Sequence, residues 1–192
     1  MPTDLDYQRA ANSLGLTIPH IKAFAEVESN GDGFLPTGEV KILFERHVFY
    51  KQLTANRGKE FADTVSKKDP DICNPSAGGY GKYSEQHPKL QRAVAIDRQS
   101  GLESCSWGAF QIMGYHWKTV GLANVQEFVN LNYSDSGQLQ CLVLFLKANP
   151  SIVTALRNKA WAAAAKLYNG PVYAANSYDT KLANAYAKFG GK

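Results

Sequence analysis

Apolar residues recur three or four positions apart through most of this 192-residue sequence, and they alternate with other residues in a single short stretch. The recurrence is typical of helices that bury one face, whereas the alternation, over residues 38–44, is typical of a half-buried strand. We expect this strand to form half of a hairpin that begins near Phe34. The pattern therefore predicts a mainly α protein, a helical bundle with one small β-hairpin.

The first two expected helices have recognisable ends. Thr3, with Asp6 three residues later, is typical of a capping box, and Gly15 is typical of a helix stop. Pro19 suits the first turn of the second helix, which the glycine-rich residues 30–33 should end. Further helices are expected over residues 47–68, 85–99, 106–113, 123–131, 136–148, 151–168 and 177–189.

Two segments stand out from this helical pattern. Residues 138–148 are apolar on nearly every side, which predicts a buried helix at the centre of the bundle. Residues 69–86 are irregular and rich in glycine and proline, yet no change of composition follows them. We therefore expect a long functional loop there rather than a linker between domains.

Composition excludes several classes of protein. With 44% apolar and 20% charged residues, the chain is in the range of globular proteins. Its longest apolar run, residues 141–146, is far shorter than the roughly 20 residues of a membrane-spanning helix. The acidic start, residues 1–6, lacks the apolar region of a secretory signal. A net charge of +4 permits a polyanionic partner but selects none.

The sequence contains no motif that is typical of a metal-binding site or a phosphate-binding loop. The three cysteines, Cys73, Cys105 and Cys141, form no CxxC pair, which argues against zinc, and their odd number argues against a disulfide framework. The four histidines show no HExxH spacing, and residues 78–82 do not match a phosphate-binding loop. We therefore expect no metal and no cofactor, and a chain that folds in a reducing cytoplasm.

Glu28 is the candidate acid. It stands at the end of an apolar helix, beside a glycine-rich break. Partial removal from water would raise the pKa of its carboxyl, which suits a general acid near neutral pH. A solvated surface carboxylate is the alternative interpretation. Glu26 lies on a different face of the same helix and is expected to be solvated.

Three separated blocks, taken in order, resemble the lysozyme superfamily, especially goose-type lysozymes and lytic transglycosylases. They are residues 24–29 (FAEVES), 106–114 (SWGAFQIMG) and 165–171 (AKLYNGP). In that superfamily a Glu-Ser pair ends the catalytic helix, a glycine-containing segment lines the cleft, and a Tyr-Asn-x-Gly segment closes it.

The resemblance is closer still to the phage-type N-acetylmuramidase (endolysin) domain family. The blocks that carry it span residues 24 to about 188 and are residues 33–34, 43–49, 78–80, 104–108 and 168–171. It implies a lysozyme-like α+β fold with the hairpin beside a catalytic cleft. It also implies a single muramidase catalytic domain over residues 1–192, without a separate cell-wall binding domain. Such a protein is made in the host cytoplasm and acts on the cell wall, in the periplasm, after release at lysis.

The resemblance implies hydrolysis of the β-1,4 bond between N-acetylmuramic acid and N-acetylglucosamine, with Glu28 as the general acid. The second catalytic group is open. Glu39 and Glu45 share one face of the expected strand, and we prefer Glu45 because it stands in the Phe-Glu-Arg-His block. An ion pair of Glu45 with Arg46 or another basic residue is the alternative. Better-known phage lysozymes carry an aspartate where this sequence has Thr37, and some relatives act with one glutamate alone.

Substrate contacts are expected from side chains that bind hydroxyl and acetamide groups or stack on sugar rings. Gln111, Tyr168 and Asn169 are the candidates for holding the sugar and orienting Glu28. Tyr80, with Tyr83 on the same loop, is a candidate rim or lid, and packing of the loop onto the body is the alternative.

The expected partner is bacterial peptidoglycan, bound by a monomer, with no nucleic acid. Three alternatives remain open: a lytic transglycosylase that forms anhydro-muropeptides, an enzyme that acts on chitin, and a non-catalytic cell-wall binding module. Residues 177–192 form a basic amphipathic pattern that permits a membrane interaction. Docking of a C-terminal helix onto the bundle is the expectation that we prefer.

Overall fold

The computed structural model describes residues 1–29 and 32–192, without the side chains of residues 172, 173 and 175. The helix break predicted at Asn30 and Gly31 lies outside the described residues. The chain groups into two compact units, and each is described here by itself. Unit 1 comprises residues 1–31 and 134–192, and unit 2 comprises residues 32–133.

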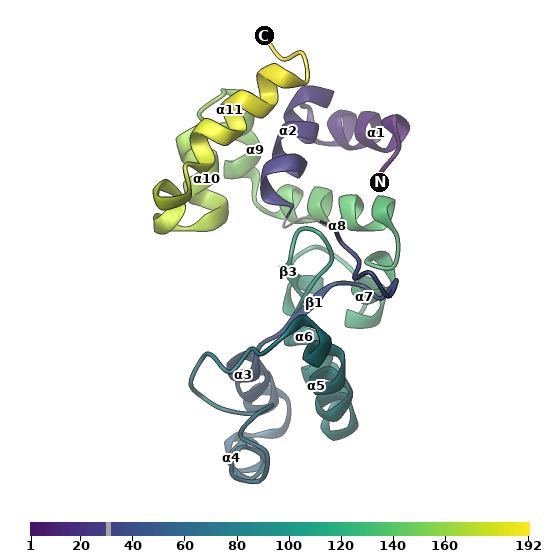
Figure 1. Cartoon of the computed structure of the whole chain (residues 1–192), viewed down its shortest axis with the longest axis vertical. Helices are drawn as coiled ribbons and strands as arrows, with labels where there is room; N and C mark the ends of the chain where they lie inside the picture. The colour runs from purple at the N-terminus through teal and green to yellow at the C-terminus, as the bar shows by residue number, and fades with distance from the viewer. Residues whose placement is uncertain (30–31) are drawn as a thin grey trace. The chain divides into compact units, whose positions relative to one another are not determined.

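All the regular elements described in unit 1 are helices (Figure 1). The predicted capping box forms, because Thr3 Oγ1 accepts from the Asp6 amide at 3.2 Å and the Asp6 carboxylate accepts from the Thr3 amide at 2.8 Å. The predicted Gly15 stop adopts a left-handed conformation. The elements of unit 1 are α1 (Asp4–Leu14), α2 (Ile18–Glu28), α8 (Asp135–Ala148), α9 (Pro150–Arg157), α10 (Trp161–Asn169), the 3₁₀ helix η2 (Pro171–Asn176) and α11 (Tyr178–Lys188).

The core of unit 1 forms where α8 and α11 meet the first two helices. The predicted central helix, α8, is buried along most of its length and packs against α1. The C-terminal helix docks as expected, because Leu182, Ala185 and Tyr186 are buried and α11 packs against α2. The single helix expected over residues 151–168 is wrong. It is two helices, since the chain turns at Lys159, which has a positive φ of 54°.

Unit 2 combines helices with a small antiparallel sheet in the order β1-β2-β3. The helices α3 and α4 replace the single helix expected over residues 47–68, because Gly58 separates them with a φ of 91°. The elements are β1 (Ile42–Phe44), α3 (Arg46–Arg57), α4 (Lys59–Lys68), α5 (Tyr83–Ile96), α6 (Arg98–Glu103), β2 (Cys105–Trp107), β3 (Ile112–Met113), the 3₁₀ helix η1 (Gly114–Trp117) and α7 (Val125–Leu131).

The predicted strand is correct in its alternation but not in its pairing. Val40, Ile42 and Phe44 are buried, and the residues between them are partly exposed. Phe34 forms only an isolated bridge with Val40, whereas β1 pairs along its length with β2, from Ile42 with Trp107 to Phe44 with Cys105. The alternation thus identifies the buried face, and the partner strand comes from more than 60 residues further along the chain.

The helix expected over residues 106–113 is wrong, because this segment is the β2–β3 hairpin. Gly108 and Gln111 both have positive φ values, 67° and 48°, which an α-helix does not accommodate. Ser106 then pairs with Met113. The predicted mainly α fold with a small β element is nevertheless confirmed, the element being a three-stranded sheet rather than one hairpin.

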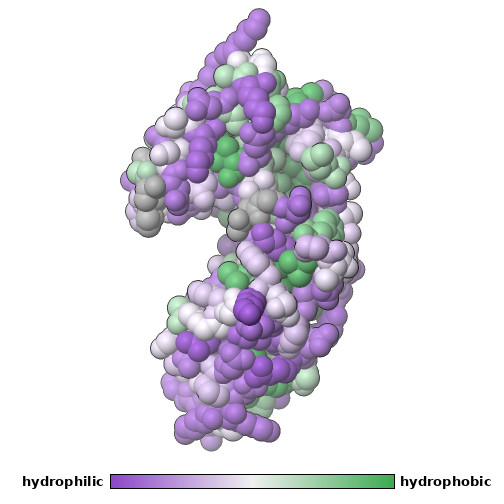
Figure 2. Space-filling view, viewed as in Figure 1, coloured by the Kyte–Doolittle hydropathy of each residue, from purple (hydrophilic) through white to green (hydrophobic). Residues whose placement is uncertain are grey.

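All three cysteines are free and buried. Burial raises the pKa of the Cys73 thiol to about 11, and it raises the pKa of the Cys105 thiol well above its ordinary value. Hydrophilic residues cover most of the visible face of each unit, with apolar residues in small separate groups (Figure 2). No single helix of the described chain is long and apolar enough to cross a membrane, and α8 and α9 together pass the same test only as a pair bent by 96°.

Candidate active site

Glu28 is the last residue of α2 and lies on the buried face of that helix. It follows the fully buried Phe24 by four residues, and residues four apart share one face of a helix. Only 9% of Glu28 is exposed. The same geometry turns Glu26 outward, where its carboxylate pairs with Lys188 Nζ at 2.7 Å. The predicted difference between the two carboxylates is therefore present in the structure.

Asn169 reaches the Glu28 carboxyl from the end of α10. Its Nδ2 donates to both carboxyl oxygens, at 3.0 Å to Oε1 and 3.1 Å to Oε2. Burial raises the pKa of Glu28 to about 7, and the Asn169 hydrogen bonds, which favour the charged form, partly offset this rise. Near neutral pH the carboxyl thus exists in both protonation states, as a proton donor that is later regenerated requires.

Tyr168 forms an aromatic wall beside this carboxyl. Its ring meets those of Phe24 and Phe145 edge-on, with centroids 5.0 Å and 5.7 Å apart. Burial raises the pKa of Tyr168, and the nearby Glu28 carboxylate adds to this rise. The phenol therefore stays protonated. Of the predicted residues, unit 1 brings Glu28, Tyr168 and Asn169 together.

Replacing Asn169 with alanine should shift the pH dependence of activity. Without its two hydrogen bonds the charged form of Glu28 loses stabilisation, so the pKa of Glu28 rises above about 7. The alkaline limb of the kcat/KM profile should then move to higher pH, which a pH–rate series on purified cell walls would measure. Asn158→Ala, at an exposed asparagine of the same unit, is the control. An unshifted alkaline limb would contradict this role of Asn169.

Unit 2 holds the second candidate carboxylate at the junction of β1 and α3. The Glu45 side chain is 21% exposed, and its Oε2 lies 3.5 Å from His47 Nε2. Arg46, the basic residue considered for an ion pair, instead donates to the backbone oxygens of Ser76 and Ala77. Glu39 is exposed and accepts from the Thr37 hydroxyl at 2.9 Å. Glu45 is thus the more enclosed of the two carboxylates considered.

Gln111 stabilises the β2–β3 turn. Its Oε1 accepts from Ser106 Oγ at 2.8 Å, and its Nε2 donates to the oxygens of Gly108 at 2.7 Å and Lys41 at 3.4 Å. The amide therefore already has protein partners on both its oxygen and its nitrogen. The contact of Gln111 with sugar stays a prediction, and the turn is the role that the geometry supports.

Two tyrosines of unit 2 present exposed rings. Tyr80, on the irregular segment before α5, is 36% exposed, and Tyr83, the first residue of α5, is 44% exposed. Lys41 Nζ lies 4.9 Å from the centre of the Tyr83 ring. Exposed aromatic faces of this kind can stack on sugar rings.

Comparison with known proteins decides the family. A model of the N-acetylmuramidase family matches residues 17–190. The chain belongs to this family. It is also similar to the crystal structure of a Burkholderia AP3 phage endolysin, with 43% identity and a TM-score of 0.92, over 98% of this chain and 71% of that one. No curated protein sequence matches.

The muramidase is therefore a peptidoglycan-degrading enzyme with a lysozyme-like fold, as the sequence predicts. The described residues contain no group of three or more His, Cys, Asp or Glu side chains that could hold a metal ion.

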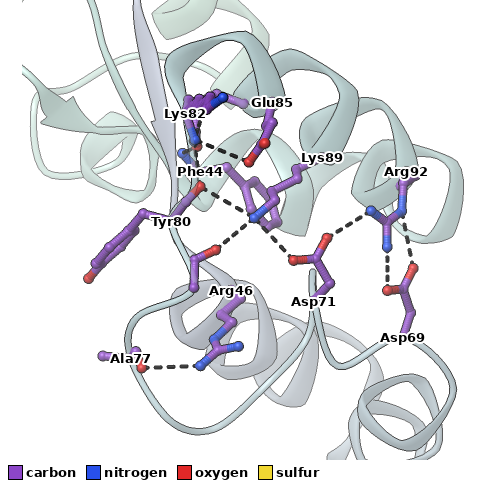
Figure 3. Close-up of polar contacts among 12 residues, drawn as sticks. Phe44, Arg46, Asp69, Asp71, Ala77, Tyr80, Lys82, Glu85, Lys89 and Arg92 are labelled. Atoms are coloured by element: carbon purple, nitrogen blue, oxygen red, sulfur yellow. Dashed lines mark hydrogen bonds and ion pairs between the residues drawn. The ribbon is translucent and has the colours of Figure 1, made fainter.

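Sequence reasoning missed two buried polar residues of the muramidase, Gln86 and Lys89. Both lie on α5 and donate to backbone oxygens of the loop that carries Tyr80. Figure 3 shows Lys89 and this loop. A signal for Gln86 exists, because it precedes the buried Leu90 by four residues and so occupies an apolar position of the helix. Lys89 has the same spacing, since it precedes the buried Ala93 by four residues, but a lysine is almost always solvated unless it is paired, so the spacing alone does not predict its burial.

Proposed function

We propose that the muramidase hydrolyses the β-1,4 bond between N-acetylmuramic acid and N-acetylglucosamine, with Glu28 as the general acid. The observation that carries the proposal is the buried Glu28 carboxyl, whose pKa is raised to about 7 by burial and which accepts two hydrogen bonds from Asn169. The family match and the endolysin similarity support the same chemistry.

In this mechanism protonated Glu28 donates its proton to the bridging oxygen as the bond to the anomeric carbon breaks. The carboxylate that results is stabilised by the Asn169 Nδ2, because hydrogen bonds to a charged acceptor are stronger than those to a neutral one. The same carboxylate then takes a proton from the water that completes hydrolysis. Asn169 thus acts on the charge that develops during the reaction.

Glu45 is the proposed second group, which stabilises the positive charge at the anomeric carbon or attacks it. Its partial enclosure and its contact with His47 Nε2 support a carboxylate held in one orientation. We further propose Tyr168, Gln111 and Tyr80 as contacts to the sugars, the exposed Tyr80 ring by stacking.

The similarity to a phage endolysin supports a biological role as well. We propose that the muramidase is made in a bacterial host cytoplasm and reaches the cell wall at lysis. It is proposed to act as a monomer on peptidoglycan, without a nucleic-acid partner.

The products that the protein releases from purified peptidoglycan distinguish the possible reactions. Mass spectrometry of the soluble muropeptides is expected to show N-acetylmuramic acid at reducing ends, which borohydride converts to the alcohol. Anhydro-muropeptides would instead indicate a lytic transglycosylase, and wall binding without product would indicate a binding module. A chitin oligosaccharide serves as the parallel substrate, and its faster cleavage would contradict the proposed bond specificity.

A further inference from the structure

The loop that carries Tyr80 is built from residues that leave it little intrinsic rigidity. Gly78, Gly79 and Gly81 all have positive φ values, 96°, 70° and 72°. Glycine-rich segments are conformationally free, so holding one of them in place costs entropy. A loop of this kind presents a side chain at a defined position only if other groups fix its backbone.

Gln86 ties this loop to the sheet. Only 1% of Gln86 is exposed, and its Nε2 donates to the Tyr80 oxygen at 2.6 Å and the Lys82 oxygen at 2.9 Å. Its Oε1 accepts from the Phe44 amide at 2.9 Å. Phe44 ends β1 and immediately precedes Glu45, so one buried amide joins the backbone of the tyrosine to the strand end next to the second candidate carboxylate.

Lys89 adds a charged anchor to the same carbonyl. It is only 7% exposed, and its Nζ donates to the oxygens of Gly79 at 2.7 Å and Tyr80 at 3.3 Å. Asp71 Oδ1, at 3.1 Å, balances the charge. Figure 3 shows Lys89 directed toward the loop, while the Tyr80 ring extends away from Lys89.

Arg46 supports the outer part of the loop. Its guanidinium donates to the oxygens of Ser76 and Ala77, at 3.2 Å and 3.3 Å. A Cβ at Gly79 would lie 2.7 Å from Arg46 Nη1, so the backbone here passes closer to the guanidinium than a side chain would allow. The anchors thus hold the backbone of the loop and leave the Tyr80 ring exposed.

We propose that Gln86 and Lys89 are positioning residues, which hold Tyr80 as a fixed stacking platform for a sugar ring of the glycan chain. The Tyr80 carbonyl accepts from both buried donors, which fixes the backbone while its ring faces solvent. Ordering the platform in advance removes an entropy cost that substrate binding would otherwise bear. This inference rests on the proposed function, because it assigns Tyr80 to the glycan.

A double-mutant cycle on Lys89 and Tyr80 tests the proposal. Binding of a soluble peptidoglycan tetrasaccharide is measured by calorimetry in the Glu28→Gln background, where the glycan stays intact. Lys89→Met and Tyr80→Ala are each expected to raise the Kd about 5-fold to 10-fold. The double variant should bind no more weakly than Tyr80→Ala alone, because the lysine acts through the tyrosine.

Arg92→Met is the matched control. It removes ion pairs to Asp69 and Asp71, one of which is also the Lys89 partner, but Arg92 does not donate to the loop carbonyls. Its Kd should equal that of the parent protein. If Lys89→Met does not fold, Gln86→Met provides the same cycle with Tyr80→Ala.

Several outcomes would overturn the positioning role. One is an unchanged Kd for Lys89→Met, and another is a double variant whose rise in Kd equals the product of the two single rises. The third is absence of tetrasaccharide binding to the Glu28→Gln protein. In the protein that retains Glu28, Lys89→Met should raise KM while kcat stays within about twofold. The lost contact stabilises the bound substrate and the transition state equally. Wild-type protein that releases no product would contradict the proposed function itself, which separates the two failures.

Discussion

Replacing Glu28 with glutamine is expected to lower the rate of peptidoglycan hydrolysis by about 10²-fold to 10⁴-fold, the usual contribution of a positioned general acid. Glutamine has nearly the same shape and remains next to Asn169, but it has no proton of suitable acidity to give to the bridging oxygen. The measurement is the initial rate of muropeptide release from purified cell walls at pH 6, where Glu28 in the wild type, with a pKa of about 7, is protonated.

Glu26→Gln is the matched control, because it makes the same chemical change two residues earlier on the same helix. Glu26 is exposed and pairs with Lys188, so its loss should leave the rate unchanged. Equal rates for the Glu28→Gln and wild-type proteins would eliminate Glu28 as the acid. Glu45→Gln in the same assay tests the proposed second group, for which a wild-type rate would support a structural ion pair with His47 instead.

The same Glu28 substitution should make the protein more stable at alkaline pH. In the folded state the pKa of Glu28 is about 7, against an ordinary value of 4.5, so between these pH values the folded chain binds more protons than the unfolded one. The free energy of unfolding of the wild type therefore falls as pH rises through this window. This pKa shift corresponds to a fall of at most about 3 kcal/mol in the free energy of unfolding.

Denaturant unfolding at pH 4 and pH 8 measures this effect as the difference between the two proteins. At pH 8 Glu28→Gln should be more stable than wild type by about 1–3 kcal/mol, relative to their difference at pH 4. Groups that titrate in both proteins contribute equally to the two free energies of unfolding, so their contributions cancel in the difference. These include His20 and His116, whose pKa values burial lowers. A difference that does not vary with pH would mean that Glu28 titrates normally and is not desolvated.

The placement of Glu28 could be predicted from the sequence because its causes are local. The apolar period of α2 fixes which face is buried, and Glu28 follows Phe24 at the spacing that shares this face. The hydrogen-bond partner of the carboxyl, by contrast, does not follow from any local pattern. Asn169 lies 141 residues away, and only the resemblance to a family suggested it.

The hairpin of residues 105–113 could not be predicted because its causes are long-range and conformational. Its strand β2 also pairs with β1, and no local pattern reveals that pairing. Its turn depends on a left-handed backbone conformation at Gln111, which glutamine seldom adopts. Lys89 was equally hidden. Its burial depends on two carbonyls and Asp71, which converge on it only in the folded chain.

The buried state of the three cysteines makes the muramidase suitable for site-specific chemistry. Thiol reagents attack the thiolate, and burial keeps Cys73 and Cys105 protonated and out of reach. A cysteine introduced at an exposed position, Ser84 in unit 2 or Thr180 in unit 1, would then be the thiol that a maleimide reaches first. Fluorophores or spin labels can thus be attached in either unit while the native cysteines are kept.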